Sequence, residues 1–411
     1  MRITALETIR LAERPNLIWL HVETDDGITG LGETFFGAGA VEAHLHETVA
    51  PGLIGRDPLA IGAIAADLAG YLGFRSTGAE MRGNSAVDLA LWDIFGQATG
   101  QPVAQLLGGF ARPAIRTYNT CAGPGYIKTT KGQTSANFGL GDTDLDDLSG
   151  FLNRADELAL SLLEEGITAM KIWPFDTAAE ASRGQYIGLP ELKRCLEPFE
   201  KIRRAAGDRM DVMVEFHGLW QLLPAMQIAR ALAPYETFWH EDPIRMDSLS
   251  SLRRYAGAST APVCASETLA GLSGFRDLVE TGVAGVVMLD VAWCGGLSTA
   301  RKVAAMAEAW HLPVAPHDCT GPVVLAASTH LALNAPNALV QESVRAFHRG
   351  WYRDVVTALP PIAGGMITVP EGPGLGLRLL PDLDRGRPPR DLLPVAGRDH
   401  QHRRRLHPDR R

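Results

Sequence analysis

The chain has 411 residues with a formal net charge of −8, 46% hydrophobic residues and 21% charged residues, which is typical of a globular protein with a large core and argues against a nucleic-acid partner. Its five cysteines are scattered without any C-x-x-C spacing, so we expect neither a disulfide framework nor a zinc site and predict a reducing, cytoplasmic location. The sequence has no run of about 18 apolar residues and no signal-peptide core, so we expect neither membrane spanning nor export.

The first part of the chain, residues 1–112, predicts an α+β domain. Three runs of alternating apolar residues predict antiparallel strands; these runs are 3–11, 16–24 and 28–36. Asp25-Asp26-Gly27, between the last two, predicts a tight hairpin. Residues 84–100 carry apolar side chains at helical spacing and end on a glycine, which predicts a helix.

Residues 113–345 predict a barrel of alternating strands and helices. Eight short apolar runs are typical of strands buried on both faces of a parallel sheet. They are 115–123, 168–175, 210–216, 236–242, 262–268, 286–291, 313–318 and 338–343. Amphipathic stretches with a serine near the start lie between several of them and predict covering helices. The fold class is therefore α/β, with an eight-stranded (β/α) barrel of the TIM type.

Acidic and histidine residues end six of these strands in succession. Glu215, Glu241 and Glu267 are each 26 residues apart (241 − 215 and 267 − 241), which is the length of one strand, one helix and two loops. Asp290, His317 and Glu342 continue the series in a similar rhythm. Because the carboxyl ends of parallel strands meet at one mouth of a barrel, we expect these six side chains to converge there.

Three carboxylates without a cysteine or a paired histidine favour a hard cation. Mg²⁺ is the first expectation and Mn²⁺ the second, with Glu215, Glu241 and Glu267 as metal ligands. Without a cation, three like charges at one mouth would raise the pKa of at least one of them. The alternative for any single glutamate is a salt bridge to a neighbouring arginine.

A general base is expected beside these glutamates. Asp290 can bind one imidazole nitrogen of His317 and leave the other facing the cavity, which equips the ring to remove a proton next to a substrate carboxylate. His217 lies two positions after Glu215, so we expect it to project from the same strand face, one step further out. It is predicted to protonate a leaving hydroxyl, the alternatives being a satisfied histidine at the rim or a hydrogen-bond donor to the substrate.

Two further side chains are candidates for the same site. Lys171 and Trp173 are predicted on one face of their strand, because side chains two apart point the same way. Lys171 is expected to hold the substrate carboxylate or to act as a base on the opposite face. Glu342 is expected either to donate a hydrogen bond, if its pKa is raised, or to anchor His317 or an arginine.

An ordered set of motifs over residues 1–380 resembles the enolase superfamily, in the mandelate racemase subgroup. The motifs are GxGE at 30–33, AVDLALWD at 86–93, QPVAQLLGG, VEFHG, HEDP, ASET, the Asp290 segment ending in GGL, APH and QES. The resemblance implies a capping N-terminal domain, a modified barrel and a C-terminal segment, 346–383, that returns to the cap. It also implies Mg²⁺ on the three glutamates, an Asp290–His317 dyad as base, a small-molecule carboxylate substrate and a homo-oligomer, dimeric or octameric.

The departures from the family pattern reduce the number of activities that the resemblance allows. Racemases and epimerases of the subgroup carry K-x-K on the second barrel strand, whereas Trp173 replaces the second lysine here. Glu215 replaces the more common aspartate and is one methylene longer. His217 resembles the histidine with which sugar-acid dehydratases expel a hydroxyl. The sequence thus predicts a Mg²⁺-dependent dehydratase that converts a polyhydroxy acid to a 2-keto-3-deoxy acid.

Two alternatives stay open at this point. One is a racemase, epimerase or cycloisomerase of a carboxylate on the same scaffold, and the other is a catalytically silent binding relative. Cap residues Phe35, Phe36 and 73–82, together with the insertion 174–190, are expected to shape the pocket. Residues 384–411, rich in Arg, Pro and His, predict a disordered basic tail rather than a nucleic-acid arm.

Overall fold

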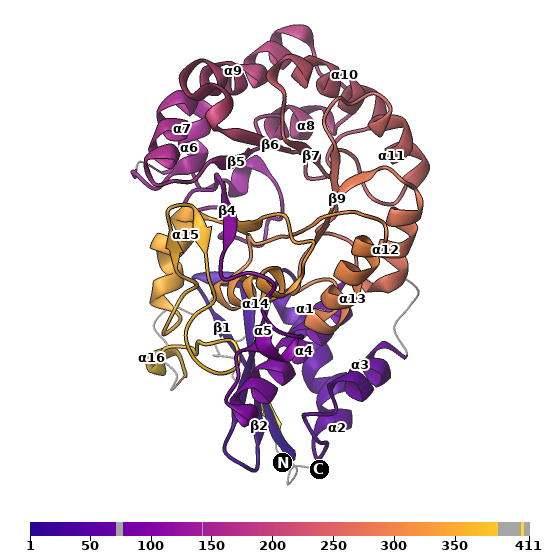
Figure 1. Cartoon of the computed structure of the whole chain (residues 1–411), viewed down its shortest axis with the longest axis vertical. Helices are drawn as coiled ribbons and strands as arrows, with labels where there is room; N and C mark the ends of the chain where they lie inside the picture. The colour runs from indigo at the N-terminus through magenta and orange to yellow at the C-terminus, as the bar shows by residue number, and fades with distance from the viewer. Residues whose placement is uncertain (71–76, 142, 385–403, 407–411) are drawn as a thin grey trace, which may run out of the picture.

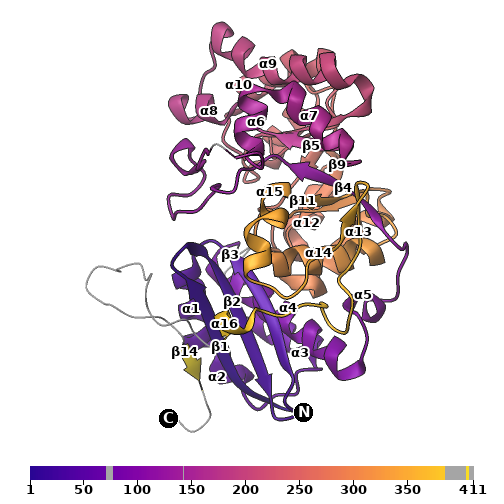
Figure 2. The same cartoon turned by 90° about the vertical axis from the view of Figure 1, so that its left-hand side faces the viewer.

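The structure is a computed structural model that describes residues 1–70, 77–141, 143–384 and the backbone of 404–406. The strands and helices of the N-terminal domain lie at one end of the long axis and the barrel lies at the other (Figures 1 and 2). Among the described residues, no helix is both long and apolar enough to span a membrane.

The N-terminal domain is a meander of three antiparallel strands packed on a long helix. The strands are β1 (Ile3–Leu11), β2 (Arg14–Thr24) and β3 (Thr29–Phe35), and the helix is α4 (Ala79–Thr99). Two glycines let β3 approach α4 closely, since a Cβ on Gly30 or Gly32 would lie about 2 Å from a carbonyl oxygen of that helix. The domain also contains α1 (Ala38–His44), α2 (Ala50–Leu53), α3 (Ile61–Ala69) and α5 (Val103–Leu106).

Eight parallel strands form the barrel, as the sequence predicts. They are β4 (Ile115–Thr120), β5 (Ala169–Ile172), β6 (Asp211–Glu215), β7 (Trp239–Glu241), β8 (Val263–Ala265), β9 (Ala284–Leu289), β10 (Val314–Pro316) and β11 (Gln341–Ser343). Neighbours in this series pair in parallel from β4 to β10. β11 pairs with β4, and a parallel bridge between Val314 and Ala338 closes the remaining side.

Helices cover the outside of the barrel and one of them lies between the two domains. The covering helices are α6 (Asp147–Asn153), α7 (Ala155–Glu164), α9 (Leu189–Ala206), α10 (Leu222–Leu232), α11 (Leu249–Ala256), α12 (Gly271–Glu280) and α13 (Gly296–Ala309). The short helix α8 (Asp176–Ser182) follows β5 and lies inside this ring (Figure 1). The next helix, α14 (Pro322–Asn334), is buried on all sides except at its last residue, because it packs against both the barrel and β3. This explains why its apolar residues show no one-sided pattern.

The chain then returns to the N-terminal domain, as the family resemblance implies. After α15 (Arg345–Arg349) and the short strand β12 (Ile362–Ala363), β13 (Met366–Ile367) pairs with β4. Gly374 then accepts the backbone N–H of Val103 at 3.0 Å, and Leu375 N–H donates to Asp93 of α4 at 2.8 Å. The segment therefore ties the barrel to the cap.

Part of the predicted tail differs from the expected disorder. Arg404–Leu406 form strand β14, which pairs antiparallel with β1 and so extends the N-terminal sheet at its open edge. The tail's first residue, Asp384, ends the short helix α16 (Pro381–Asp384). The rest of the predicted tail lies outside the described residues. The division of the chain at 112, 345 and 383 stays a prediction.

Candidate active site

The three candidate metal ligands meet at the carboxyl ends of adjacent strands. Glu215 and Glu241 are the last residues of β6 and β7, and Glu267 follows β8 by two positions. One carboxylate oxygen from each lies within 4.8 Å of the others. Burial raises the pKa of Glu215 to about 7, and burial together with Glu215 raises that of Glu241 well above its usual value. These are the shifts expected of carboxylates that are buried close to one another.

Lys171 of β5 lies among these acids and carries the compensating charge. Its Nζ lies 2.6 Å from Glu241 Oε1, 3.0 Å from Glu342 Oε1 and 3.4 Å from Glu215 Oε2. Although burial lowers the pKa of Lys171, the surrounding carboxylates raise it well above its usual value. The ammonium group is therefore held charged, and lysine rather than arginine is the partner of the strand-end glutamates.

The predicted histidine–aspartate dyad is formed across the ends of β9 and β10. His317 Nδ1 lies 2.8 Å from Asp290 Oδ2, and His317 Nε2 lies 2.9 Å from Glu267 Oε2. Asp290 is itself oriented by the backbone N–H of Ala292, which donates to Oδ1 at 2.6 Å. Although burial lowers the pKa of His317, Glu267 and Glu342 raise it well above the usual value. Conversely, burial raises the pKa of Glu267, but contact with His317 lowers it to about 2.

Glu342 is an acceptor in this structure. It accepts the backbone N–H of Asp318 at 3.0 Å and the hydroxyl of Thr120, and it lies 4.0 Å from His317 Nε2. Although burial raises the pKa of Glu342, Lys171 and His317 lower it overall. This direction is opposite to the one that a hydrogen-bond donor would need. The nearest charged partner of Glu342 is Lys171 at 3.0 Å, and neither His317 nor an arginine, so the role of Glu342 stays a prediction.

His217 belongs to a second dyad, whose aspartate the sequence analysis missed. Strand β6 ends at Glu215, and His217 has a left-handed backbone with φ 49°, so the expectation that it simply continues the strand face is wrong. Its Nδ1 lies 2.8 Å from Oδ2 of Asp176, the first residue of α8. Although burial lowers the pKa of His217, Asp176 raises it overall. The insertion 174–190 thus reaches the pocket, as predicted, through Asp176.

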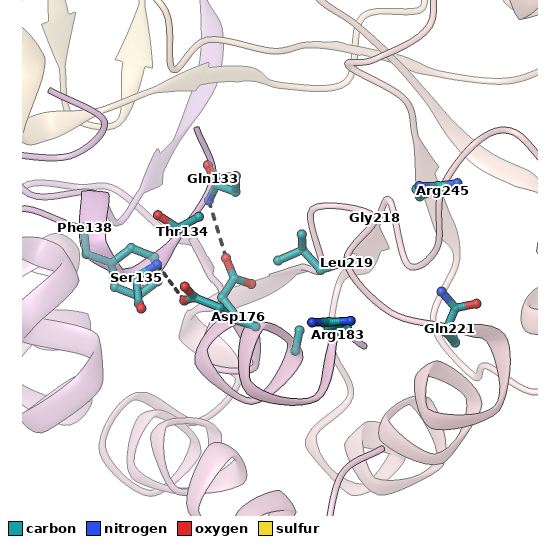
Figure 3. A pocket seen from close by; sticks show the side chains of 12 residues that line it. Gln133, Thr134, Ser135, Phe138, Asp176, Arg183, Gly218, Leu219, Gln221 and Arg245 are labelled. Atoms are coloured by element: carbon teal, nitrogen blue, oxygen red, sulfur yellow. Dashed lines mark hydrogen bonds between the residues drawn. The ribbon is translucent and has the colours of Figure 1, made fainter. Parts of the chain in front are cut away.

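Gln133 also contacts this second dyad and was not predicted. Its side-chain nitrogen lies 3.4 Å from Asp176 Oδ2 and 3.3 Å from His217 Nε2, and it donates to the Tyr126 hydroxyl at 2.6 Å. Figure 3 shows Gln133 facing Asp176 across the groove that Leu219 and Arg245 also line. The cap fixes this loop, because Asn16 donates to the carbonyls of residues 127 and 129. No strand-end pattern marks a loop residue of this kind.

Both histidines line one cavity of about 40 Å³, together with Lys171, Glu215, Glu267, Glu342 and Trp173. Phe35 and Phe36 of the cap line it too, as predicted. Of the predicted cap stretch 73–82, residues 73–76 lie outside the described residues. Arg82 donates to the Phe35 carbonyl at 3.1 Å and lies 4.7 Å from the Trp293 ring, which packs against His317. The cap therefore reaches His317 through Trp293.

The donor set fits a hard divalent cation. The three ligands are carboxylates, the type of oxygen donor that Mg²⁺ prefers. Buried Glu215 Oε2 accepts no hydrogen bond from the described residues and has only the ion-pair contact with Lys171 at 3.4 Å, so it has room for a further ligand. The extra methylene of Glu215 is accommodated because its Oε1 accepts the backbone N–H groups of Phe216 and His217 at 3.0 and 2.7 Å, which folds the carboxylate back. The longer ligand therefore still reaches the other two.

Comparison with known proteins agrees with this architecture. Residues 154–383 match the family described as enolase C-terminal domain-like, and residues 4–108 match the N-terminal domain family of mandelate racemase and muconate lactonizing enzyme. The chain belongs to the enolase superfamily, in its mandelate racemase subgroup. A crystal structure of an enolase of that subgroup from Agrobacterium tumefaciens is 68% identical, covers 94% of this chain and 96% of its own, and has a TM-score of 0.84.

Relatives of this superfamily member include enzymes with named activities. D-Galactonate dehydratase from Ralstonia nicotianae is 31% identical over 386 residues, with 92% of each chain covered. D-Xylonate dehydratase from Haloferax volcanii is 28% identical over 389 residues, which cover 93% of this chain and 87% of the relative. The family and these relatives together support an enzyme of the carbon–oxygen lyase class.

Proposed function

We propose that the chain is a Mg²⁺-dependent dehydratase that removes water from a polyhydroxy (sugar) acid and releases a 2-keto-3-deoxy acid. The observation that carries the proposal is the pair of dyads at one cavity. His317 and His217 each have Nδ1 bound by a buried aspartate, and both rings line that cavity. An elimination needs both a base and an acid, and these two histidines supply one of each.

The base is His317. Its Nε2 takes the proton from C2 of the substrate, and the C–H electrons pass into the carboxylate to give an enediolate. Asp290, buried against Nδ1, fixes the tautomer and stabilises the imidazolium that forms. Mg²⁺ held by Glu215, Glu241 and Glu267 would neutralise the charge on the substrate carboxylate and on the enediolate. Lys171, among the same acids, adds a positive charge beside that carboxylate.

The acid is His217. Its imidazolium, stabilised by Asp176, gives a proton to the 3-hydroxyl as the C3–O bond breaks, so that water leaves and the C2–C3 enol remains. The enol then gains a proton at C3 and loses the proton of its 2-hydroxyl, which gives the 2-keto-3-deoxy acid.

Trp173 weighs against racemisation on this scaffold. An indole cannot act as the base or acid that removes or returns the proton on C2. The Trp173 indole is buried and packs edge-on against His217, with the two ring centroids 5.8 Å apart. Lys171, the amine of strand β5, is held by three carboxylates. The second base of a two-base mechanism is therefore missing from this face. The named dehydratase relatives also support elimination.

The test is a panel of sugar acids incubated with purified protein and Mg²⁺, with an assay for 2-keto-3-deoxy product. We expect turnover of at least one acid and loss of that turnover on chelation. No turnover of any acid contradicts the proposal. Deuterium exchange at C2 without loss of water indicates a racemase or epimerase instead. A cytoplasmic location and a dimeric or octameric assembly remain predictions.

A further inference from the structure

One buried residue of the cap, Asn16, is bonded to a loop of the barrel beside His217. Asn16 lies on β2 and is 4% exposed, and its Nδ2 donates to the backbone carbonyls of Ile127 at 3.1 Å and Thr129 at 2.8 Å. Both carbonyls belong to residues 126–137, which lie between β4 and α6. We refer to these residues as the Gln133 loop.

The conformation of the Gln133 loop depends on such bonds. Ile127 has a left-handed backbone with φ 49°, which is unfavourable for a β-branched residue. Its N–H donates to the Asn137 carbonyl at 2.9 Å, and its carbonyl accepts the bond from Asn16. The side chain of Asn137, which is 3% exposed, donates to the Thr129 and Gly132 carbonyls at 2.8 and 3.1 Å. A strained residue keeps its conformation only where its surroundings fix it, so loss of the Asn16 side chain should let the loop move.

Gln133 transmits the position of this loop to His217. Its side-chain nitrogen lies 3.4 Å from His217 Nδ1 and 3.3 Å from His217 Nε2, and 3.4 Å from Asp176 Oδ2, which it faces in Figure 3. Since the two ring distances are nearly equal, Gln133 packs against the imidazole and does not occupy the end of either nitrogen alone. Asp176 lies 2.8 Å from Nδ1, so Gln133 and Asp176 together set the orientation of the ring.

His317 is held by other elements. Its Nδ1 is bound by Asp290 at 2.8 Å, and Asp290 accepts the backbone N–H of Ala292 at 2.6 Å. The contact of Asn16 with the cap residue Phe36 is made by the backbone, because the Asn16 carbonyl accepts the Phe36 N–H at 2.9 Å. A side-chain substitution at Asn16 keeps that bond. It should therefore disturb His217 and spare His317.

We propose that Asn16 is a positioning residue for proton transfer to the leaving hydroxyl. It acts from the cap through the Gln133 loop, and Gln133 holds the ring of His217. The inference rests on the proposed dehydratase function and extends it: loss of water depends on this contact between cap and barrel, whereas removal of the C2 proton does not.

The experiment compares the wild-type protein with Asn16→Ala, Gln133→Ala, the double variant and a matched control, Asn337→Ala. Asn337 also uses one side-chain amide to donate to two backbone carbonyls, those of Ala304 at 3.1 Å and Leu312 at 2.9 Å. Its own carbonyl accepts the N–H of Val314, the first residue of β10, so it lies at the end of the barrel opposite to the site.

Two rates are measured in D₂O with Mg²⁺ and a sugar acid that the wild type dehydrates. One is the rate of water loss, and the other is the appearance of deuterium at C2 of the remaining substrate, followed by NMR. Thermal unfolding of each variant shows how much stability the substitution removes. The ratio of exchange to water loss is the deciding quantity, because general loosening of the site lowers both rates together.

Asn16→Ala should lower kcat for dehydration by about tenfold, within the range found for groups that orient a histidine from behind. The ratio of exchange to water loss should rise by a similar factor, because His317 still removes the C2 proton. Gln133→Ala should raise the same ratio, and the double variant should be no slower than Gln133→Ala, since Asn16 acts through Gln133. Asn337→Ala should keep the wild-type ratio.

Three results would overturn the inference while the proposed function stands. They are an unchanged ratio in Asn16→Ala, an unchanged ratio in Gln133→Ala, and a double variant in which the two losses multiply. The second of these decides the matter even where Asn16→Ala does not fold. Turnover of no sugar acid by the wild type would instead overturn the proposed function and the inference with it, so the two failures are distinguishable.

Discussion

The two dyads of the active site are built in different ways. Asp290 and His317 directly follow adjacent barrel strands, and both are nearly inaccessible to solvent. His217 instead lies beyond a strand end in a left-handed conformation, its aspartate comes from helix α8, and its side chain is 15% exposed. The barrel therefore positions His317, the proposed base, while loops position His217, the proposed acid. A chemical step that many reactions share is expected on the barrel scaffold, and a step that depends on the substrate is expected on the loops.

The largest expected effect comes from the base. His317→Asn removes the imidazole that takes the C2 proton, so dehydration should fall by about 10³-fold or more. Steady-state kinetics on the best sugar acid measure this. His311→Asn is the control, since His311 is exposed and asparagine tolerates its φ of 57°. Residual activity within tenfold of the wild type would remove His317 from the role of base.

The next largest effect tests the acids that lie beside the base. Mutation of a residue that only orients a metal ligand typically weakens metal binding by about 10–100-fold. Glu241→Gln alters a proposed ligand itself, so it should weaken Mg²⁺ binding by at least that much. The wild-type protein should unfold at a higher temperature when Mg²⁺ is added, because a ligand that binds only the native state stabilises it. The variant should lose this shift at the same Mg²⁺ concentration, and exposed Glu308→Gln should keep it. An unchanged shift in Glu241→Gln would contradict the metal site.

The two aspartates behind the histidines allow a direct comparison of the dyads. Asp290→Asn should lower dehydration by roughly 100-fold and Asp176→Asn by roughly tenfold, within the range found for groups that orient a histidine from behind. The loss should be larger for Asp290→Asn because Asp290 is itself fixed by the backbone at the barrel mouth. In Asp176→Asn, Gln133 still contacts His217 and should preserve part of the orientation of the ring. Equal losses would show that the loop dyad is as tightly constrained as the barrel dyad.

The last prediction concerns stability and not activity, and it involves a buried histidine for which no carboxylate partner is found among the described residues. His330 of α14 accepts the Ala104 N–H at Nδ1 and contacts the Leu375 carbonyl through Nε2. Burial lowers the pKa of His330 to about 4. As the pH falls from about 6.5 to about 4, the unfolded chain binds a proton that the folded chain does not, so stability should fall by about 3 kcal/mol from this group.

Urea unfolding at several pH values measures the contribution of His330. His330→Asn should be less stable than the wild type at pH 7, but its stability should depend less on pH between 4 and 6.5. An equally steep pH dependence in the variant would show that other groups cause the acid sensitivity.

The sequence predicts the barrel and the convergence of its strand-end residues well, because both follow from periodicity. The residues that end the strands repeat at the pitch of one strand and one helix, so Glu215, Glu241, Glu267, Asp290 and His317 could be placed together before the structure was known. Asp176 and Gln133 could not, since they come from an insertion and a loop whose paths depend on tertiary contacts. The pairing of residues 404–406 with β1 was equally hidden in a polar, arginine-rich stretch.

The most direct test of the separate roles of His317 and His217 is exchange of the C2 proton in D₂O, followed by NMR on the best sugar acid. His217→Asn should still exchange the C2 proton for deuterium while losing water elimination, because His317 and Asp290 remain in place. His317→Asn should show neither exchange nor elimination. Full dehydration by His217→Asn, or exchange at the wild-type rate by His317→Asn, would contradict the assignment of the two histidines.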